Sequence, residues 1–268
     1  MVLIELKMEH ITCGYGKKEV VKGLSASVGS GDILCLLGSN GVGKTTLFKT
    51  ILGFLPLLDG RITIGGIETG GISRLQYAKL VGYVPQTHNA PFAFSVLDVV
   101  MLGRTAYLGA FGRPGPKDVE KAYEVLEELQ ISYLANRVFT ELSGGERQMV
   151  MIARALVQEP AFIMLDEPTS NLDFGNQTKV LQQVLELSRK GIGVIMTTHA
   201  PDHAFLCKGK VVLLYRDHTY ESGDVRQVVT GESLSKAYGL PVKIASEKKD
   251  GEEICYCYPV MNRPCHVR

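Results

Sequence analysis

A glycine-rich stretch at 38–45 carries residue types that bind phosphate groups. It reads Gly-Ser-Asn-Gly-Val-Gly-Lys-Thr, with an apolar run before it and apolar residues at helical spacing after it. Glycines allow backbone N–H groups to curl around phosphate oxygens, and the N-terminus of a following helix adds a positive dipole. Lys44 is then placed to contact the β- and γ-phosphates, and the Thr45 hydroxyl to ligate Mg²⁺. The stretch therefore predicts a site for the phosphates of a nucleotide.

Two carboxylates, Asp166 and Glu167, follow the apolar run Phe162–Leu165. A buried strand that delivers acids at its carboxyl end places them beside the phosphate-binding loop of a parallel sheet. Asp166 would then hold Mg²⁺ through water, and Glu167 would polarise the attacking water. Many strands end in an acidic turn, so the pattern gains its meaning from the loop upstream. Together the two segments predict hydrolysis of a nucleoside triphosphate.

The segment Leu142–Glu146 has two interpretations. It reads Leu-Ser-Gly-Gly-Glu at the start of a predicted helix. Taken alone, Ser143 is a helix N-cap followed by a flexible glycine pair. A helix N-terminus without bulky side chains is also an anion site. The phosphate loop and the carboxylate pair in the same chain favour the second interpretation.

The order of these segments resembles that of the ABC ATPases over nearly the whole chain. The resemblance rests on residues 38–45, Gln86, residues 142–146, Asp166 and Glu167, the segment Ser170–Asp173, and His199. It implies an α/β fold: a P-loop NTPase core with a mostly parallel sheet, an N-terminal antiparallel β subdomain and an inserted helical subdomain. It also implies that Ser143–Gly145 faces the γ-phosphate bound by a second copy, so that two ATP molecules lie between two copies.

The resemblance also assigns roles to single residues, with ATP and Mg²⁺ as cofactors. It implies catalytic roles for Lys44, Gln86, Glu167 and His199, and Mg²⁺ binding by Thr45, Gln86 and Asp166. The residues expected to bind the nucleotide are Tyr15, Gly38, Ser39, Asn40, Gly41, Gly43, Lys44, Thr45, Thr46, Ser143, Gly144, Gly145 and Asp173.

Three of these assignments compete with plainer ones. Tyr15, in Gly-Tyr-Gly, resembles the aromatic residue that stacks on adenine, although a tyrosine on a sheet face would look the same. Gln86 resembles the residue that links Mg²⁺ and the attacking water to the helical subdomain. His199 resembles the histidine that contacts the γ-phosphate, although a lone histidine at a strand end is often a surface residue. A metal pair of His199 with His203 is rejected, because Pro201 lies between them and a third ligand is missing.

The alternation of strand-like and helical patterns supports this architecture. Apolar runs predict strands at 33–37, 162–165, 194–197 and 211–214, and a helix is expected around 176–189. Apolar stripes at helical spacing cover 119–129 and 149–156. The helix after the phosphate loop is expected to run to Pro56. We predict an ATPase domain at 1–240, with a helical subdomain inserted at about 88–158, and a short C-terminal extension at 241–268.

Bulk properties bound the partners. The chain has 29 Lys and Arg against 28 Asp and Glu, a net charge of +1, and no basic stripe is visible, so nucleic acid is not an expected partner. The six cysteines are expected to be free thiols. No signal peptide or membrane-spanning run is evident. We expect a peripheral protein on the cytoplasmic face of the membrane, working with two membrane-spanning permease subunits and a separate substrate-binding protein.

The direction and cargo of transport are predicted by resemblance alone. The segment 100–104 (Val-Met-Leu-Gly-Arg), the segment 199–204 (His-Ala-Pro-Asp-His-Ala) and the tail 238–242 resemble importers of metal chelates: iron siderophores, haem, cobalamin or metal oxyanions. Phe92, Phe94 and Arg104 are expected to form the docking surface for the permease. An importer of amino acids or peptides, and a non-transport ABC ATPase of DNA repair or translation, are the alternatives.

The C-terminal cysteines have two interpretations. Cys255 and Cys257 at one-residue spacing lie on one face of a strand, which favours packing of a terminal strand. With Cys265 and His266 they instead suggest a metal or redox site. Zinc sites usually show a Cys-x₂-Cys spacing, so packing is the favoured interpretation.

Overall fold

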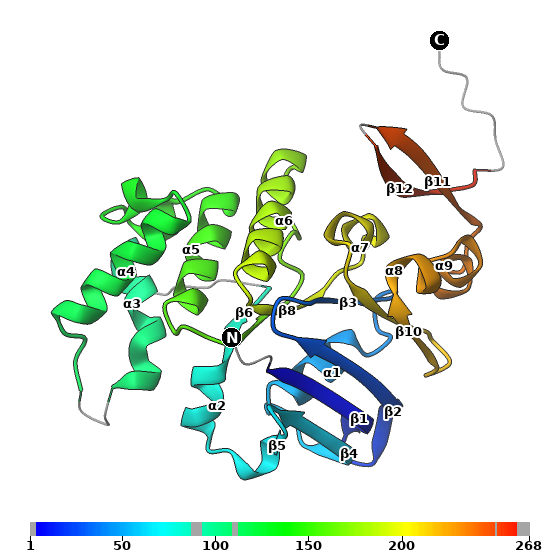
Figure 1. Ribbon diagram of the computed structural model, residues 1–268, viewed down its shortest axis with the longest axis horizontal. Helices are drawn as coiled ribbons and strands as arrows, with labels where there is room; N and C mark the ends of the chain where they lie inside the picture. Colours follow the sequence, from blue (N-terminus) through cyan, green and yellow to red (C-terminus); the bar gives the residue numbers. More distant parts are fainter. Residues whose placement is uncertain (1–3, 87–92, 109–111, 250, 262–268) are drawn as a thin grey trace.

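The central element of the fold is a six-stranded sheet. The computed structural model describes residues 4–86, 93–108, 112–249 and 251–261 (Figure 1). The strand order is β10-β9-β3-β8-β7-β6, in which β10 runs antiparallel to β9 and the other neighbours are parallel. The strands are β3 (Ile33–Leu37), β6 (Val81–Val84), β7 (Phe162–Leu165), β8 (Gly193–Thr197), β9 (Lys210–Leu214) and β10 (Tyr220–Asp224).

The apolar runs of the sequence become the inner strands because both faces of this sheet are covered. Every residue of β3, β7 and β8 is buried. Alternate side chains enter two different cores: Cys35 and Leu37 pack with the helices, whereas Leu34 packs with the N-terminal sheet and α1. Figure 1 shows α5 (Gly144–Leu156), α6 (Phe174–Arg189) and α7 (Pro201–Cys207) on one side of the sheet. On the other side lie α1 (Lys44–Ile51) and the strands β1 (Glu5–Tyr15), β2 (Lys18–Gly29) and β4 (Leu57–Ile64).

The N-terminal part forms an antiparallel sheet of order β2-β1-β4-β5. Its strands are β1 (Glu5–Tyr15), β2 (Lys18–Gly29), β4 (Leu57–Ile64) and β5 (Ile67–Glu68). Together with the central sheet this confirms the predicted fold class. Helix α1 (Lys44–Ile51) packs between the two sheets and ends before Pro56, the predicted stop. The chain leaves the helix at Gly53, whose φ of 71° suits glycine and breaks the helical path.

The α-helices α3 (Val96–Met101), α4 (Pro116–Glu128) and α5 lie between β6 and β7, within the span predicted as a helical subdomain. The limits of that subdomain, at about 88–158, stay a prediction. Ser95 caps the start of α3. It accepts a hydrogen bond from the Asp98 N–H, while the Asp98 carboxylate accepts from the Ser95 N–H. Further helices are α2 (Arg74–Leu80), α8 (Val225–Val228) and α9 (Gly231–Tyr238).

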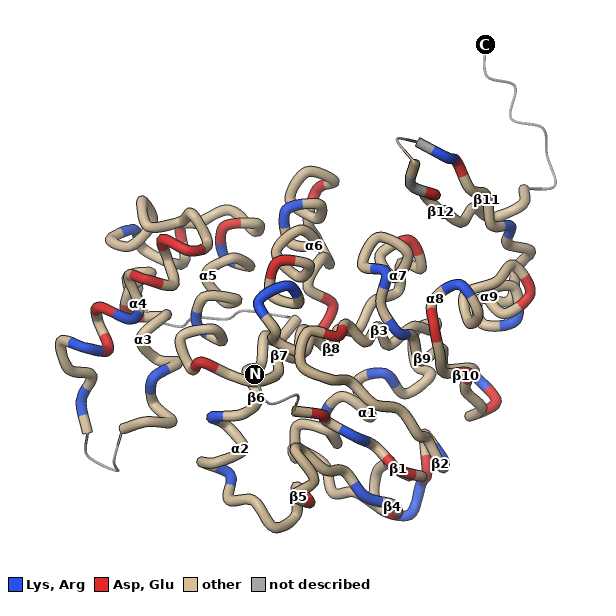
Figure 2. Tube along the Cα trace, viewed as in Figure 1, with Lys and Arg blue, Asp and Glu red and all other residues tan. Residues whose placement is uncertain are grey.

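A two-stranded hairpin, β11 (Val242–Lys249) and β12 (Glu252–Pro259), follows α9 and packs beside α7. Cys255 and Cys257 lie on the face of β12 that packs against the helical core, which confirms the packing interpretation of this pair. Within the described ranges, no helix is both long and apolar enough to cross a bilayer. Figure 2 shows Lys and Arg interspersed with Asp and Glu along α4 and around β1, β2 and β4.

Candidate functional site

The phosphate-binding loop lies between β3 and α1, at the carboxyl end of the central strand. Three glycines of the loop, Gly38, Gly41 and Gly43, have φ values of 145°, 84° and 112°. A Cβ atom on Gly38 would lie 2.7 Å from the Leu214 carbonyl oxygen, and one on Gly43 would lie 2.7 Å from a methyl carbon of Val20. Positive φ explains the glycine at all three positions, and close packing adds to it at Gly38 and Gly43.

Lys44 begins α1 and turns its side chain back over the loop. Its Nζ donates to the carbonyl oxygens of Gly38, at 2.7 Å, and Ser39, at 3.1 Å. Burial lowers the pKa of Lys44 from its ordinary value, and the nearby carboxylates of Glu167 and Asp166 partly offset that effect. The ammonium thus lies within the electrostatic reach of both acids that end β7.

Asp166 and Glu167 are joined through one buried hydroxyl. Thr197, at the end of β8 and 1% exposed, accepts a hydrogen bond from the Glu167 N–H at 2.7 Å and donates to Asp166 Oδ1 at 2.7 Å. Burial raises the pKa of the Asp166 carboxyl, with the hydrogen bond from Thr197 acting in the opposite direction. The neighbouring strand therefore fixes both acids, a role for Thr197 that the sequence analysis missed.

The Glu167 carboxylate lies between the two polar side chains that the sequence predicted as its neighbours. Gln86 Nε2 donates to Glu167 Oε2 at 2.9 Å, and His199 Nδ1 lies 3.6 Å from the same oxygen. The three residues line one pocket of about 320 Å³, together with Asn40 of the phosphate loop. Glu167 has a φ of 45°, so the chain turns sharply where the carboxylate leaves the strand. The structure thus brings three of the four predicted catalytic residues together, while Lys44 bonds to the phosphate loop.

The residues predicted to bind Mg²⁺ fit that ion by the chemistry of their donors. Asp166 offers a nearly buried carboxylate, Thr45 at the start of α1 a hydroxyl, and Gln86 an amide carbonyl oxygen, since its Nε2 is engaged by Glu167. Mg²⁺ prefers such oxygen ligands and is commonly held by one or two protein groups together with phosphate oxygens and water.

Two side chains frame the phosphate loop on its open side. Tyr15, at the end of β1, is 52% exposed, and its hydroxyl lies 3.5 Å from the Thr46 hydroxyl. The Tyr15 ring is thus held beside the loop with part of its surface open to solvent. Arg216, in the turn after β9, donates to Ser39 Oγ at 3.5 Å. Arg216 was not predicted, and its only sequence signal is a basic residue in the turn after an apolar strand.

The signature segment Ser143–Gly145 forms the beginning of α5. Ser143 caps the helix and pairs with Glu146: the Ser143 N–H donates to the Glu146 carboxylate at 2.8 Å. A Cβ on Gly145 would lie 2.5 Å from Asn176, whose amide donates to the Asp173 carboxylate at 2.7 Å. Gly145 therefore lets the start of α5 approach the start of α6.

Within a single chain, Ser143, Gly144 and Gly145 are not among the described residues that line the Glu167 pocket. That pocket is lined by Ser170 and Asn171 of the segment before Asp173, whereas Gly145 lines a different groove beside Asn176. Asp173 is the N-cap of α6 and accepts from the Asn176 N–H. The structure of one copy thus does not bring Ser143 or Asp173 to the phosphate loop.

The predicted docking cation is engaged inside the chain. Arg104 has a side chain only 14% exposed, and it forms ion pairs with Asp118 at 2.9 Å and Glu159 at 3.2 Å. Its guanidinium also lies over the Tyr107 ring, 4.0 Å from the centroid. The Arg104 charge thus joins α4 to the segment after α5, which weighs against the expected contact of Arg104 with a permease. Phe94 is 41% exposed, and Phe92 lies outside the described residues.

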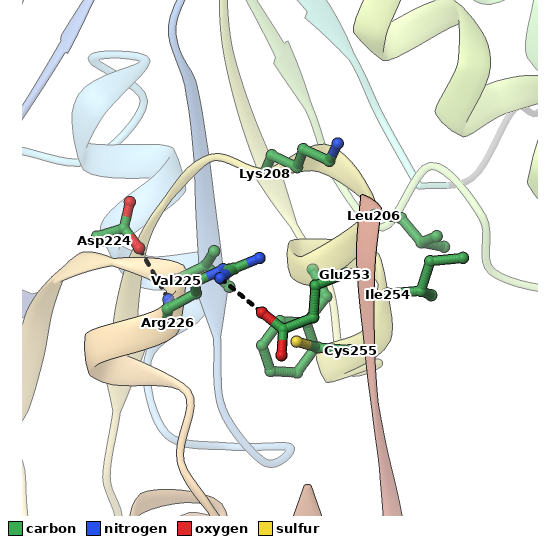
Figure 3. Close-up of a pocket in the computed structure, with 9 residues that line it drawn as sticks. Leu206, Lys208, Asp224, Val225, Arg226, Glu253, Ile254 and Cys255 are labelled. Carbon is green, nitrogen blue, oxygen red and sulfur yellow. Dashed lines mark hydrogen bonds and ion pairs between the residues drawn. The ribbon is translucent and has the colours of Figure 1, made fainter. Parts of the chain in front are cut away.

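A small pocket of about 160 Å³ separates the C-terminal hairpin from α7 and α8 (Figure 3). The Arg226–Glu253 ion pair, at 2.9 Å, spans it between α8 and β12. Cys255 lines it as well. Among the described residues no group of three or more His, Cys, Asp or Glu side chains could hold a metal ion, and Cys265 and His266 lie outside them. The hairpin is thus held against the core across this pocket by the ion pair of Arg226 with Glu253.

Comparison with known proteins agrees with this site. The family profile described as ABC transporter matches residues 21–170. An uncharacterised ABC transporter ATP-binding protein of Haemophilus influenzae is 40% identical over 233 residues, covering 87% of this chain and 89% of the relative. The molybdate import ATP-binding protein MolC of the same organism is 37% identical over 220 residues, covering 82% and 81%.

Two further comparisons extend over almost the full length. The iron(3+)-hydroxamate import ATP-binding protein FhuC of Bacillus subtilis is 30% identical over 257 residues, covering 96% of each chain. The structure of a metal-chelate type ABC transporter in an inward-facing conformation matches with a TM-score of 0.87 and 33% identity, covering 97% of this chain and 98% of that one. The chain therefore belongs to the ATP-binding proteins of ABC transporters, which are ATPases coupled to transport.

Proposed function

We propose that the chain is the ATP-hydrolysing subunit of an importer for a metal chelate or a metal oxyanion, with Glu167 as the residue that polarises the attacking water. The observation that carries the site assignment is the position of the Glu167 carboxylate, held by Gln86 at 2.9 Å and beside His199 at 3.6 Å in a pocket shared with the phosphate loop. A carboxylate so placed can accept a proton from water as a γ-phosphate is attacked.

The other residues would divide the remaining work. The loop N–H groups and Lys44 bind and orient the phosphates, and Tyr15 stacks on the adenine. His199 donates to the γ-phosphate and thereby senses its presence. Thr45, Asp166 and Gln86 would hold Mg²⁺, which supplies charge neutralisation at the phosphate oxygens when bound. Thr197 keeps the two acids at fixed separation through the hydrogen bonds at its hydroxyl.

A second copy of the chain would complete the site. The start of α5 presents Ser143 and two glycines away from the Glu167 pocket, with the backbone N–H groups of a helix N-terminus. Such a surface suits a phosphate bound elsewhere, and the family resemblance makes that the γ-phosphate of the opposite copy. Closure of two copies over two ATP molecules, and reopening after hydrolysis, would move the permease only if the two states differ in their contacts with it.

The permease would dock in an apolar groove of about 820 Å³ between the end of α1, α2 and the end of α5. Phe54, 61% exposed, and Tyr83 form an edge-to-face pair in the groove, with ring centroids 5.7 Å apart. Arg154 of α5 lines the opposite wall. The groove lies between the ATPase core and the helical part. We propose it as the docking surface in place of the surface predicted around Arg104. An aromatic-lined cleft of this size suits the end of an inserted helix.

The cargo is proposed from the relatives, whose names include molybdate and iron(3+)-hydroxamate import, and from the metal-chelate type structure. The subunit would lie on the cytoplasmic face, with two permease subunits and a substrate-binding protein as partners. Deletion of the gene should abolish uptake of one labelled siderophore, corrinoid or oxyanion, and Glu167→Gln should not restore it. Loss of amino-acid or peptide uptake alone would identify the competing importer class. Intact transport combined with sensitivity to DNA damage would identify the non-transport class.

A further inference from the structure

His203, on α7, is buried beside the catalytic pocket and has no role in the assignments above. It is 9% exposed and lines the same pocket as Glu167 and His199. Its Nδ1 atom lies 3.0 Å from the Thr198 hydroxyl and 3.4 Å from the Thr169 hydroxyl. Both threonines are themselves almost completely buried, at 2% and 4% exposure. One ring nitrogen thus meets two hydroxyls in a site screened from solvent.

The two threonines belong to the two segments that carry the predicted catalytic groups. Thr198 directly precedes His199, and its hydroxyl also accepts a hydrogen bond from the Ala200 N–H at 3.1 Å. Thr169 lies two residues after Glu167, in a turn closed by the Ser170 N–H donating to the Glu167 carbonyl at 3.0 Å. His203 therefore contacts the segment of the γ-phosphate sensor and the segment of the water-polarising carboxylate at once.

The local chemistry favours a neutral ring at this position. Burial lowers the pKa of His203 below its ordinary value, and the neighbouring His199 lowers it further. A neutral imidazole has one donor and one acceptor nitrogen, so it can either accept from a threonine hydroxyl or donate to it at Nδ1. In both forms the contacts at Nδ1, the stronger with Thr198 and the weaker with Thr169, link the two segments without placing a charge near the phosphates.

We infer that His203 is a positioning residue that fastens the Glu167 segment to the His199 segment, so that the carboxylate and the sensor histidine keep their 3.6 Å approach. It acts through Thr169 and Thr198. The inference rests on the proposed roles of Glu167 and His199. Loss of the contact is expected to lower kcat about tenfold, the lower end of the range found when side chains that orient site residues are removed, and to leave the KM for ATP within about twofold.

Paired amide variants test which ring nitrogen matters. The amide of asparagine reaches the place of Nδ1, whereas that of glutamine reaches the place of Nε2. We expect His203→Asn to keep kcat within about twofold of wild type, and both His203→Gln and His203→Ala to lower it about tenfold. The assay is steady-state hydrolysis by the purified full chain with Mg-ATP, and melting curves report the fold of each variant. Full activity of the Gln and Ala variants, or a more active Gln than Asn variant, overturns the inference.

A double-mutant cycle provides the second test, and its Thr169→Val arm stays informative if the His203 variants fold poorly. Thr169→Val and His203→Ala should each lower kcat, and the double variant should lose no more than His203→Ala alone, because that variant already lacks the contact that Thr169→Val removes. Multiplication of the two losses contradicts the inference. Glu167→Gln serves as the reference: unchanged turnover there rejects the proposed function itself, whereas inactive Glu167→Gln beside fully active His203 variants rejects the positioning role alone.

Discussion

Thr197→Val tests how far a single hydroxyl supports both acids of the site. The substitution keeps the shape of the side chain but removes one acceptor and one donor. The Glu167 N–H then loses its partner at 2.7 Å, and Asp166 Oδ1 loses a donor at 2.7 Å. Because the position is 1% exposed, water cannot fully replace either bond. A buried polar group left without its partner costs about 1–3 kcal/mol, so two such groups should cost about 2–6 kcal/mol of stability.

The matched control is Thr50→Val, which is the same substitution at a site with 3% exposure. Thr50 donates to the Thr46 carbonyl one turn earlier in α1, at 3.0 Å, and that carbonyl also receives the helical backbone bond. The Thr50 hydroxyl also contacts the Cys13 thiol, which is a weak hydrogen-bonding group. Loss of the hydroxyl should cost below about 1 kcal/mol. Urea unfolding of both variants measures the difference. Equal stability of the two variants refutes the reasoning that Thr197 supports the acids.

The same variant should show a pH-dependent defect in binding Mg-ATP. Burial raises the pKa of Asp166, and the Thr197 hydrogen bond opposes that rise. Removing the bond should raise the pKa of Asp166 further. When the pH is lowered, Asp166 of the variant should therefore take up its proton, and lose its ability to bind Mg²⁺, at a higher pH than Asp166 of wild type. Affinity for Mg-ATP in the variant should therefore weaken at a higher pH than in wild type. A curve that superimposes on that of wild type contradicts this coupling.

Three further substitutions test separate parts of the account. Gly43→Ala should weaken ATP binding about tenfold or more, because φ at Gly43 is 112° and the new Cβ would lie 2.7 Å from Val20. The control is Gly70→Ala, where the new Cβ lies in open space, and this variant should bind ATP normally. Arg104→Glu should lower the free energy of unfolding by about 2–4 kcal/mol, since it places a third carboxylate between Asp118 and Glu159. The same change at exposed Arg113 should lower it little, and urea unfolding measures both variants. Ser143→Arg should bind ATP as a monomer but fail to form an ATP-dependent dimer in size-exclusion chromatography; normal dimerisation would speak against the sandwich.

Much of the site could be predicted because its residues are continuous in sequence. The phosphate loop and the acids after β7 follow fully apolar strands, and a parallel sheet brings the carboxyl ends of such strands to one edge. The start of α3 at Ser95 was readable from its capping residues. In these segments local pattern and tertiary fold agree.

The omissions concern side chains whose surroundings come from distant segments. Arg104 meets Glu159 across 55 positions of sequence, and a basic residue in a helical stretch looks exposed until that partner is known. Thr197 contacts acids 30 and 31 positions earlier. His203 was considered only as a metal ligand, since its burial between two threonines has no local signature. The Phe54 groove forms only when α1, α2 and α5 pack together.

The central claim, that Glu167 polarises the water that attacks ATP, is tested most directly by Glu167→Gln. The substitution keeps the size of the side chain and the phosphate contacts of Lys44 but removes the proton acceptor. The account predicts a loss of about 10²–10⁴ in kcat, with ATP affinity by calorimetry within about twofold of wild type and a stable ATP-bound dimer. Turnover at the wild-type rate, with ATP bound normally, would contradict it.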